Sequence, residues 1–187
     1  TDVSASAYRV YERQGYTYDW QTRGVNFFET VYRVRLVPGG NGLAQAGDAV
    51  AGFVKLDIPA DASVDTFADQ LLLTLKSDFE PVHGTKMESG MLVAISMRDF
   101  LNGRRDKWTY LFKPTLKQSL QNFAKTENFI VLNVLDSVQG MLQPWRYKGN
   151  GEWEQQEPGK RQIASIRVTA KAPRRSDAVW VTSAGFR

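Results

Sequence analysis

Hydrophobic and polar residues alternate with a period of two in several parts of the chain. From 164 to 171 the even positions are apolar, and the odd positions are polar or cationic. Tyr32, Val34 and Leu36 alternate with Arg33 and Arg35 in the same way. Successive side chains of a strand point to opposite faces, so both segments predict strands with an apolar back and a basic front.

The same pattern predicts further strands, separated by turn-forming residues. The expected strands cover 28–37, 50–58, 71–76, 107–113, 116–123, 128–135 and 161–171. Pro38–Gly42 predicts a turn, 59–69 a loop, and 140–160 a long loop or a hairpin that turns at Gly149–Gly151. Trp108, Tyr110 and Phe112 share one face of their strand, which favours burial in the core.

Two segments have the marks of helices. Ser89 is a candidate N-cap, apolar residues follow near helical spacing up to Phe100, and Gly103 is a candidate end. Residues 173–187 also begin like a helix, with Ser176 or Asp177 as the N-cap. A short similarity between the two segments predicts two units of strands followed by a helix, at about 26–103 and 104–187.

The N-terminal residues do not follow this pattern as clearly. Tyr8, Tyr11, Tyr16, Tyr18 and Trp20 lie among charged residues. We therefore expect residues 1–25 to form an aromatic-rich arm. Its aromatic side chains should dock on the body of the protein or on a partner, because each can bury a large apolar area.

The distribution of charge along the chain is the most informative part of its composition. The chain has 187 residues, 42% of them apolar, which is enough for a substantial core. Its formal net charge is +4, but residues 1–103 carry −4 and residues 104–187 carry +8. This asymmetry favours an acidic partner, most simply a nucleic acid. The alternative is an ordinary solvated basic face.

Several classes of chemistry lack support in the sequence. The absence of cysteine excludes disulfides, zinc–thiolate sites and thiol catalysis. His83, the one histidine, lies in an expected loop without an interpretable catalytic constellation. Glu152, Glu154 and Glu157 lack the Asp/Asn/Gly frame of a cation-binding loop. No phosphate-binding or dinucleotide motif is present. We therefore expect no enzymatic activity, no cofactor and no metal site.

The sequence also bears on targeting. No apolar run approaches the ~18 residues of a membrane span, so no membrane contact is expected. No signal or transit peptide is visible. The chain begins at Thr1, which is compatible with a mature form from which a targeting segment has been removed.

Basic residues on the predicted strands and loops are candidate contacts to phosphate. Each such contact releases counterions and makes binding depend on salt. Trp145 and Tyr147 are the better candidates for stacking on bases, because they lie in the expected loop beside basic residues. The candidate nucleic-acid-binding residues are Arg33, Arg35, Lys55, Lys76, Lys107, Lys113, Lys117, Arg146, Lys148, Arg161, Arg167 and Lys171.

The order of the expected elements resembles the Whirly fold. The resemblance is carried by the segment ESGMLVAISM (88–97), the strand that ends at Phe112-Lys113-Pro114 and the terminal helix. The fold is shared by plant single-stranded-DNA binders and by trypanosomatid mitochondrial RNA-binding proteins. The plant proteins' KGKAALSV strand is absent here, and FETVYRVR (28–35) stands in its place, so the resemblance points to the RNA-binding relatives.

This resemblance implies an α+β fold, a duplicated unit of antiparallel strands and a helix, with two sheets and the helices at a subunit contact. It covers 26–187 as one domain. It implies sequence-tolerant binding of single-stranded guide RNA through phosphates, and annealing to pre-mRNA during RNA editing in the mitochondrion (kinetoplast). It also implies a hetero-oligomer, a tetramer with a related subunit. Two alternatives remain open, a single-stranded-DNA protein of transcription or genome maintenance and a β-rich structural or interaction subunit.

Overall fold

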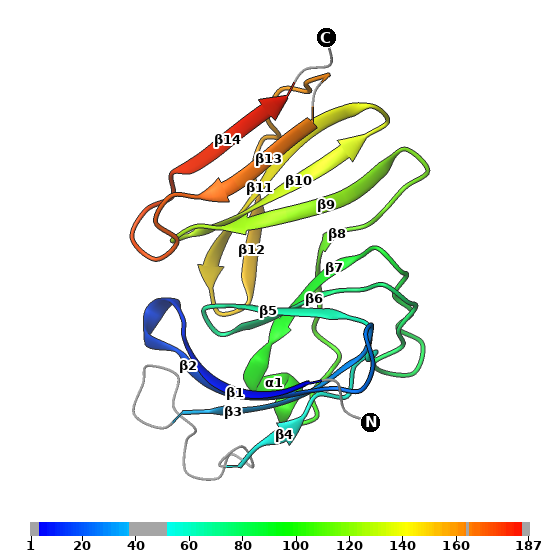
Figure 1. Cartoon of the computed structure of the whole chain (residues 1–187), viewed down its shortest axis with the longest axis vertical. Helices are drawn as coiled ribbons and strands as arrows, with labels where there is room; N and C mark the ends of the chain where they lie inside the picture. Colours follow the sequence, from blue (N-terminus) through cyan, green and yellow to red (C-terminus); the bar gives the residue numbers. More distant parts are fainter. Residues whose placement is uncertain (1–3, 38–51, 164, 185–187) are drawn as a thin grey trace. The chain divides into compact units, whose positions relative to one another are not determined.

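The chain is nearly all β. A computed structural model describes residues 4–37, 52–163 and 165–184. Pro38–Gly42 lies outside these residues. The described strands form four antiparallel sheets (Figure 1). The chain divides into two compact units, Thr1–Tyr110 and Leu111–Arg187. This boundary falls later than the expected one at 103.

The first sheet of the first unit is a meander near the N-terminus. It consists of β1 (Ser4–Tyr11), β2 (Thr17–Gly24), β3 (Thr30–Leu36) and β4 (Val54–Lys55), in that order. The expectation of an N-terminal arm is therefore wrong, because residues 4–24 form a hairpin. Gln14 and Gly15 turn the chain with φ of 62° and 78°, and the strand aromatics Tyr18 and Trp20 face the core.

The second sheet contains the segment that was expected to form the first helix. It consists of β5 (Ser63–Phe67), β6 (Gln70–Thr74), β7 (Leu92–Ser96) and β8 (Thr109–Phe112). Residues 92–95 are all buried, so β7 is covered on both faces and shows no alternation. Only α1 (Met97–Leu101) is helical, and Ser96 caps it by accepting a hydrogen bond from the backbone N–H of Asp99. Ser89 instead donates to the carbonyl of Lys76.

One core joins the two sheets of the first unit. Its buried apolar side chains come from β2, β3, β6, β7 and α1. The Tyr18 hydroxyl donates to the carbonyl of Ala68 at 2.6 Å, which links β2 to the turn between β5 and β6. Trp108 and Tyr110 pack against this core, and Phe112 is buried, as expected from their shared face.

The second unit begins with a third meander. It consists of β9 (Gln118–Lys125), β10 (Phe129–Asp136), β11 (Gln139–Gly149) and β12 (Glu152–Gln155). The hairpin expected at Gly149–Gly151 is present, and all three turn residues have positive φ. A two-stranded ribbon, β13 (Ser165–Ala170) and β14 (Val179–Ala184), packs on this sheet through Val168.

The second expected helix is also wrong, because the chain from Val179 to Ala184 is strand β14. The apparent capping residue Asp177 has a different role. Its carboxylate accepts hydrogen bonds from the Thr126 hydroxyl at 2.9 Å and the Asn128 backbone N–H at 2.7 Å. Burial raises the pKa of Asp177, but these hydrogen bonds outweigh burial and hold the pKa below its ordinary value.

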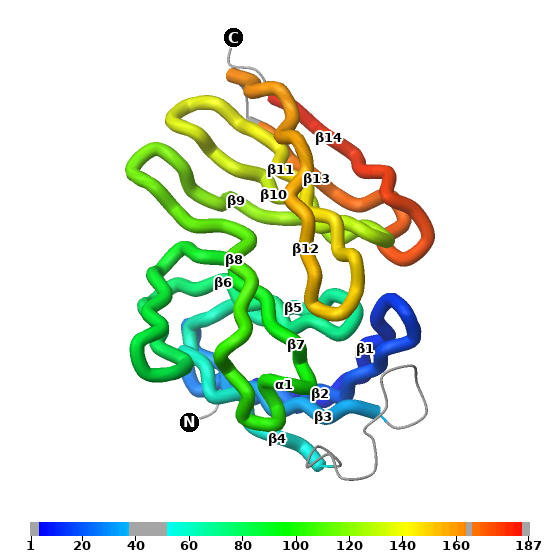
Figure 2. Tube along the Cα trace, turned by 180° about the vertical axis from the view of Figure 1, so that it is seen from behind, coloured from blue at the N-terminus to red at the C-terminus, as the bar shows by residue number. Residues whose placement is uncertain are grey.

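The α+β class expected from the resemblance is therefore wrong. The described chain contains one five-residue α-helix instead of a helix after each group of strands. No described helix is long and apolar enough to cross a membrane. Each four-stranded sheet pairs strands in the order in which they occur along the chain (Figure 2). Successive meanders of this kind are typical of the blades of a β-propeller.

Candidate functional site

The outer face of the sheet β1–β4 carries three of the predicted phosphate contacts, Arg33, Arg35 and Lys55. Along β2, Tyr18 and Trp20 point to the core, so Asp19, Gln21 and Arg23 point outward. In β3, Val34 and Leu36 are buried, and Arg33 and Arg35 take the outer positions by the same alternation. Register places Asp19 opposite both Arg9 and Arg35, and Arg33 opposite Lys55. The face therefore divides into two zones.

In the first zone, Asp19 forms ion pairs with two arginines. Arg9 donates to its carboxylate oxygens at 2.7 and 3.1 Å, and Arg35 donates to Oδ2 at 2.8 and 2.9 Å. The hydrogen bond from Arg9, with a further contribution from Arg35, outweighs burial and lowers the pKa of Asp19 from 3.8 to about 2. The Arg35 guanidinium also lies over the Phe53 ring, 4.8 Å from its centroid.

Asp19 should make the stability of the chain depend on pH. A carboxyl whose pKa is lowered by folding stabilises the protein fully above its unfolded value, near 3.8, and loses that effect as the pH falls toward 2. We expect Asp19→Asn to cost about 1 kcal/mol at pH 6. The difference between the two proteins should shrink as the pH falls from 5 to 2, as measured by urea unfolding. A difference that stays constant over this range would contradict the assignment.

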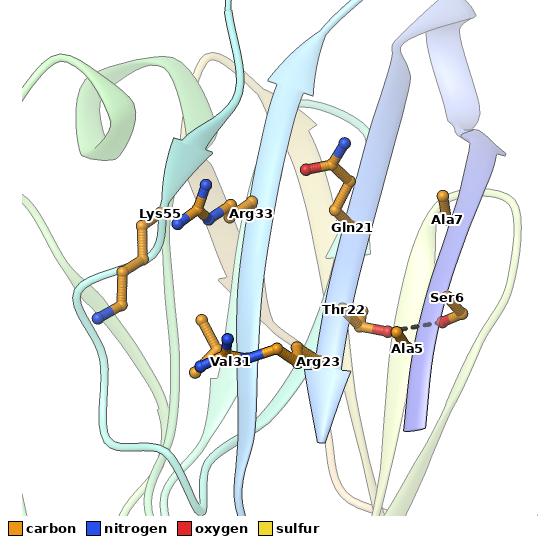
Figure 3. Close-up of a pocket in the computed structure, with 9 residues that line it drawn as sticks. All are labelled: Ala5, Ser6, Ala7, Gln21, Thr22, Arg23, Val31, Arg33 and Lys55. Carbon is orange, nitrogen blue, oxygen red and sulfur yellow. Dashed lines mark hydrogen bonds between the residues drawn. The ribbon is translucent and has the colours of Figure 1, made fainter. Parts of the chain in front are cut away.

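The second zone is a shallow hollow of about 660 Å³, and its lining holds three cationic side chains and no carboxylate among the described residues. Arg23 of β2, Arg33 of β3 and Lys55 of β4 line it (Figure 3). The β1 side is low, because Ala5 and Ala7 have small side chains. Within the described residues, no carboxylate forms an ion pair with Arg33 or Lys55.

The structure distributes the other candidate residues widely. Arg33, Arg35 and Lys55 share the face just described, whereas Lys76 and Lys107 lie elsewhere in the first unit. Seven candidates belong to the second unit: Lys113, Lys117, Arg146, Lys148, Arg161, Arg167 and Lys171.

Some of the candidates in the second unit already have partners. Lys148 contacts Glu154 at 3.2 Å, and Arg161 contacts Asp136 at 2.7 Å. The Lys171 ammonium lies 4.3 Å from the centroid of the Trp180 ring. Arg167 is exposed on β13, beside the buried Val168. The expected basic front of this strand is therefore short, because Lys171 lies just beyond its end.

The expected stacking role of Tyr147 is wrong. Its ring is buried, lies 4.6 Å from the Trp153 ring, and its hydroxyl accepts a hydrogen bond from the backbone N–H of Gly151. Trp145 is partly buried, and its indole N–H is buried without a hydrogen-bond partner among the described residues. Both residues lie on β11, where cross-strand neighbours on β12 compete with a base for the ring faces.

Sequence reasoning missed Arg9 and Arg23. Both were assigned to the expected arm, although Tyr18 and Trp20 alternate there with Asp19, Gln21 and Arg23. This period of two was the available signal. Gly15 between two aromatic segments was the matching signal for a hairpin.

Among the residues that the structure describes, no catalytic constellation surrounds the histidine. His83 is fully exposed, and its Nδ1 lies 3.8 Å from the Glu80 carboxylate. Within residues 4–37, 52–163 and 165–184, no three His, Cys, Asp or Glu side chains come together in a way that could hold a metal ion.

Neither a protein-family model nor a curated protein matches the sequence. A solved structure does match: a post-proline cleaving enzyme from Rickettsia typhi aligns with 97% of this chain at a TM-score of 0.74. The two sequences are 16% identical over the alignment. That enzyme is a β-propeller peptidase. The likeness shows the fold of the chain, in agreement with its successive four-stranded meanders.

The chain spans only 25% of the length of that enzyme. The match therefore concerns only one part of the Rickettsia typhi enzyme. The alternation of apolar and polar residues is preserved in a fold of this kind even where few residues are identical, because each strand must keep one face toward the core.

Proposed function

We propose that this chain is a non-catalytic segment of the β-propeller of a peptidase that cleaves after proline. The observation that carries the proposal is the structural match to a post-proline cleaving enzyme over 97% of the chain. The three consecutive four-stranded meanders support it, since each has the strand order of a propeller blade.

In this proposal the groups that break the peptide bond come from another part of a longer protein. The chain has one histidine and no cysteine, and His83 is exposed without a described nucleophile beside it. Blades of a propeller surround a central channel. The segment would therefore contribute walls that hold or admit a peptide.

The test is a cleavage assay on the full-length product of the gene that encodes this chain. The substrate is a ten-residue peptide with one internal proline, and mass spectrometry identifies the products. We expect cleavage on the carboxyl side of proline by the full-length product and none by residues 1–187 alone. His83→Ala in the full-length product should leave the rate unchanged.

Two results would overturn this proposal. One is an intact peptide after incubation with the folded full-length product. The other is cleavage by residues 1–187 alone that disappears in His83→Ala, which would make the chain itself an enzyme.

Single-stranded RNA binding stays a prediction of the charge pattern. Guide-RNA annealing, a tetramer with a related subunit, and mitochondrial location rest on the Whirly resemblance, and no comparison bears on them.

A further inference from the structure

We propose that the hollow beside Arg33 and Lys55 is a binding site for phosphate groups. The inference does not depend on the peptidase proposal, because it rests on the outer face of the sheet β1–β4 alone. The two zones of that face differ, because Arg35 has a carboxylate partner whereas the lining of the hollow contains none among the described residues.

The arrangement of Arg33 and Lys55 is unfavourable without an anion. The two residues are direct cross-strand partners on β3 and β4, and like charges in this position repel each other. Arg35, two residues along the same strand, has Asp19 as its partner. No equivalent carboxylate accompanies Arg33 or Lys55 among the described residues. A bound anion would supply the missing negative charge.

The hollow has the space and the donors that a phosphate group needs. Arg23 adds a third cation to the wall, and Gln21, opposite Arg33, adds a neutral amide. Arginine presents two parallel N–H groups that match two phosphate oxygens. A lysine ammonium has no such paired donors and acts as a point charge. The three cations come from three neighbouring strands, so they can contact more than one phosphate group (Figure 3).

The site also has a fixed backbone. β1 and β2 pair over their whole length, and β2 pairs with β3 from Gly24 to Tyr18. The Ser6 and Thr22 hydroxyls are hydrogen-bonded at 2.6 Å beside the hollow (Figure 3). Side chains on paired strands lose less freedom on binding than side chains on a loop, which favours affinity.

Phosphate fits this charge distribution better than the carboxylates of an acidic peptide. A phosphate monoester carries close to two negative charges and three acceptor oxygens, whereas a carboxylate carries one charge and two oxygens. The source of the phosphate is either a free oligophosphate or the backbone of a single-stranded RNA. The end groups of an oligophosphate carry the second charge, whereas each RNA diester carries one charge and two free oxygens, and successive diesters can each meet a different cation.

The test is isothermal titration of the chain with inorganic tripolyphosphate in 50 mM salt. We expect Arg33→Ala to weaken binding about tenfold, since a charge-assisted interaction is lost. Arg35→Ala is the matched control, because it removes the same charge from the same strand and face, but from a side chain whose donors are already bonded to Asp19. It should change affinity less than about twofold, and circular dichroism checks that both variants are folded.

Two further titrants separate the sources of phosphate. A 12-nucleotide oligo(U) RNA that binds more tightly than tripolyphosphate, with a steep dependence on salt, would identify an RNA backbone as the ligand. Tighter binding of tripolyphosphate would identify a free oligophosphate. The proposal is overturned if no phosphate compound binds, if polyglutamate binds equally well, or if Arg33→Ala and Arg35→Ala weaken binding to the same extent.

Discussion

Replacing Phe100 by alanine is expected to lower the free energy of unfolding by about 3–5 kcal/mol. The Phe100 ring is fully buried in the core of the first unit. Trp108 packs edge-on against it with a centroid distance of 6.0 Å, and the Arg105 guanidinium lies 4.3 Å from the centroid. The substitution leaves a cavity and removes both contacts, and urea unfolding monitored by tryptophan fluorescence measures the cost.

Leu116→Ala provides the control for this prediction. Leu116 is fully exposed, so the change should alter the unfolding free energy by less than about 0.5 kcal/mol. Equal effects of the two substitutions would show that Phe100 does not occupy the core position described above.

The second large effect is expected for Glu12→Ala, at about 3 kcal/mol. Glu12 and Arg13 form an ion pair whose side chains are only 2% and 6% exposed. Thr66 of β5 donates its hydroxyl to Glu12 at 2.9 Å, and the Arg13 guanidinium lies over the Phe67 ring. Removal of the carboxylate takes one ion-pair partner from a buried guanidinium and one acceptor from a buried hydroxyl. Urea unfolding of the single variants and the double variant measures the coupling.

The double variant separates a lost charge partner from a simple loss of packing. If the charges are coupled, Glu12→Ala/Arg13→Ala should cost less than the sum of the two single substitutions. Strict additivity would count against the buried ion pair as the source of the effect.

Much of the strand pattern follows from the sequence. The strands near 28–37, 107–113, 116–123 and 128–135 were expected within a few residues of β3, β8, β9 and β10. In β3 the period of two is clear, because Val34 and Leu36 are buried while Arg33 is exposed. Such strands have one face toward a core and one toward solvent, which is the condition that makes them recognisable.

The two predicted helices failed for different physical reasons. In β7 the run Leu92–Ile95 is buried on both faces, and an apolar run without alternation does not distinguish a strand from a helix. Before β14, Ser176 and Asp177 resemble an N-cap, but the Asp177 carboxylate accepts hydrogen bonds from the turn at 126–128. Its partners lie about 50 residues away in the chain, so local sequence does not reveal them.

The candidate site was predicted in part. Arg33 and Arg35 were identified from strand alternation and Lys55 from its place on a predicted strand, and all three lie on one sheet face. The distinction between Arg33 and Arg35 depends on Asp19, which lies on a neighbouring strand that was not expected. Cross-strand pairing decides which cation already has a carboxylate partner. The pairing of β2 with β3 was not predicted, because β2 lies within the residues expected to form an arm.

The order of strands within the sheets has a consequence for synthesis on the ribosome. Each described sheet is assembled from strands that follow one another in the chain. Short loops connect β1 to β3, β5 to β6 and β9 to β12, whereas longer segments connect β3 to β4, β6 to β7 and β7 to β8. A growing chain can therefore complete β1–β2 before β3 has emerged, and β9–β12 without waiting for the C-terminal ribbon. Local pairing of this kind shortens the time during which unpaired strand edges are exposed to other nascent chains.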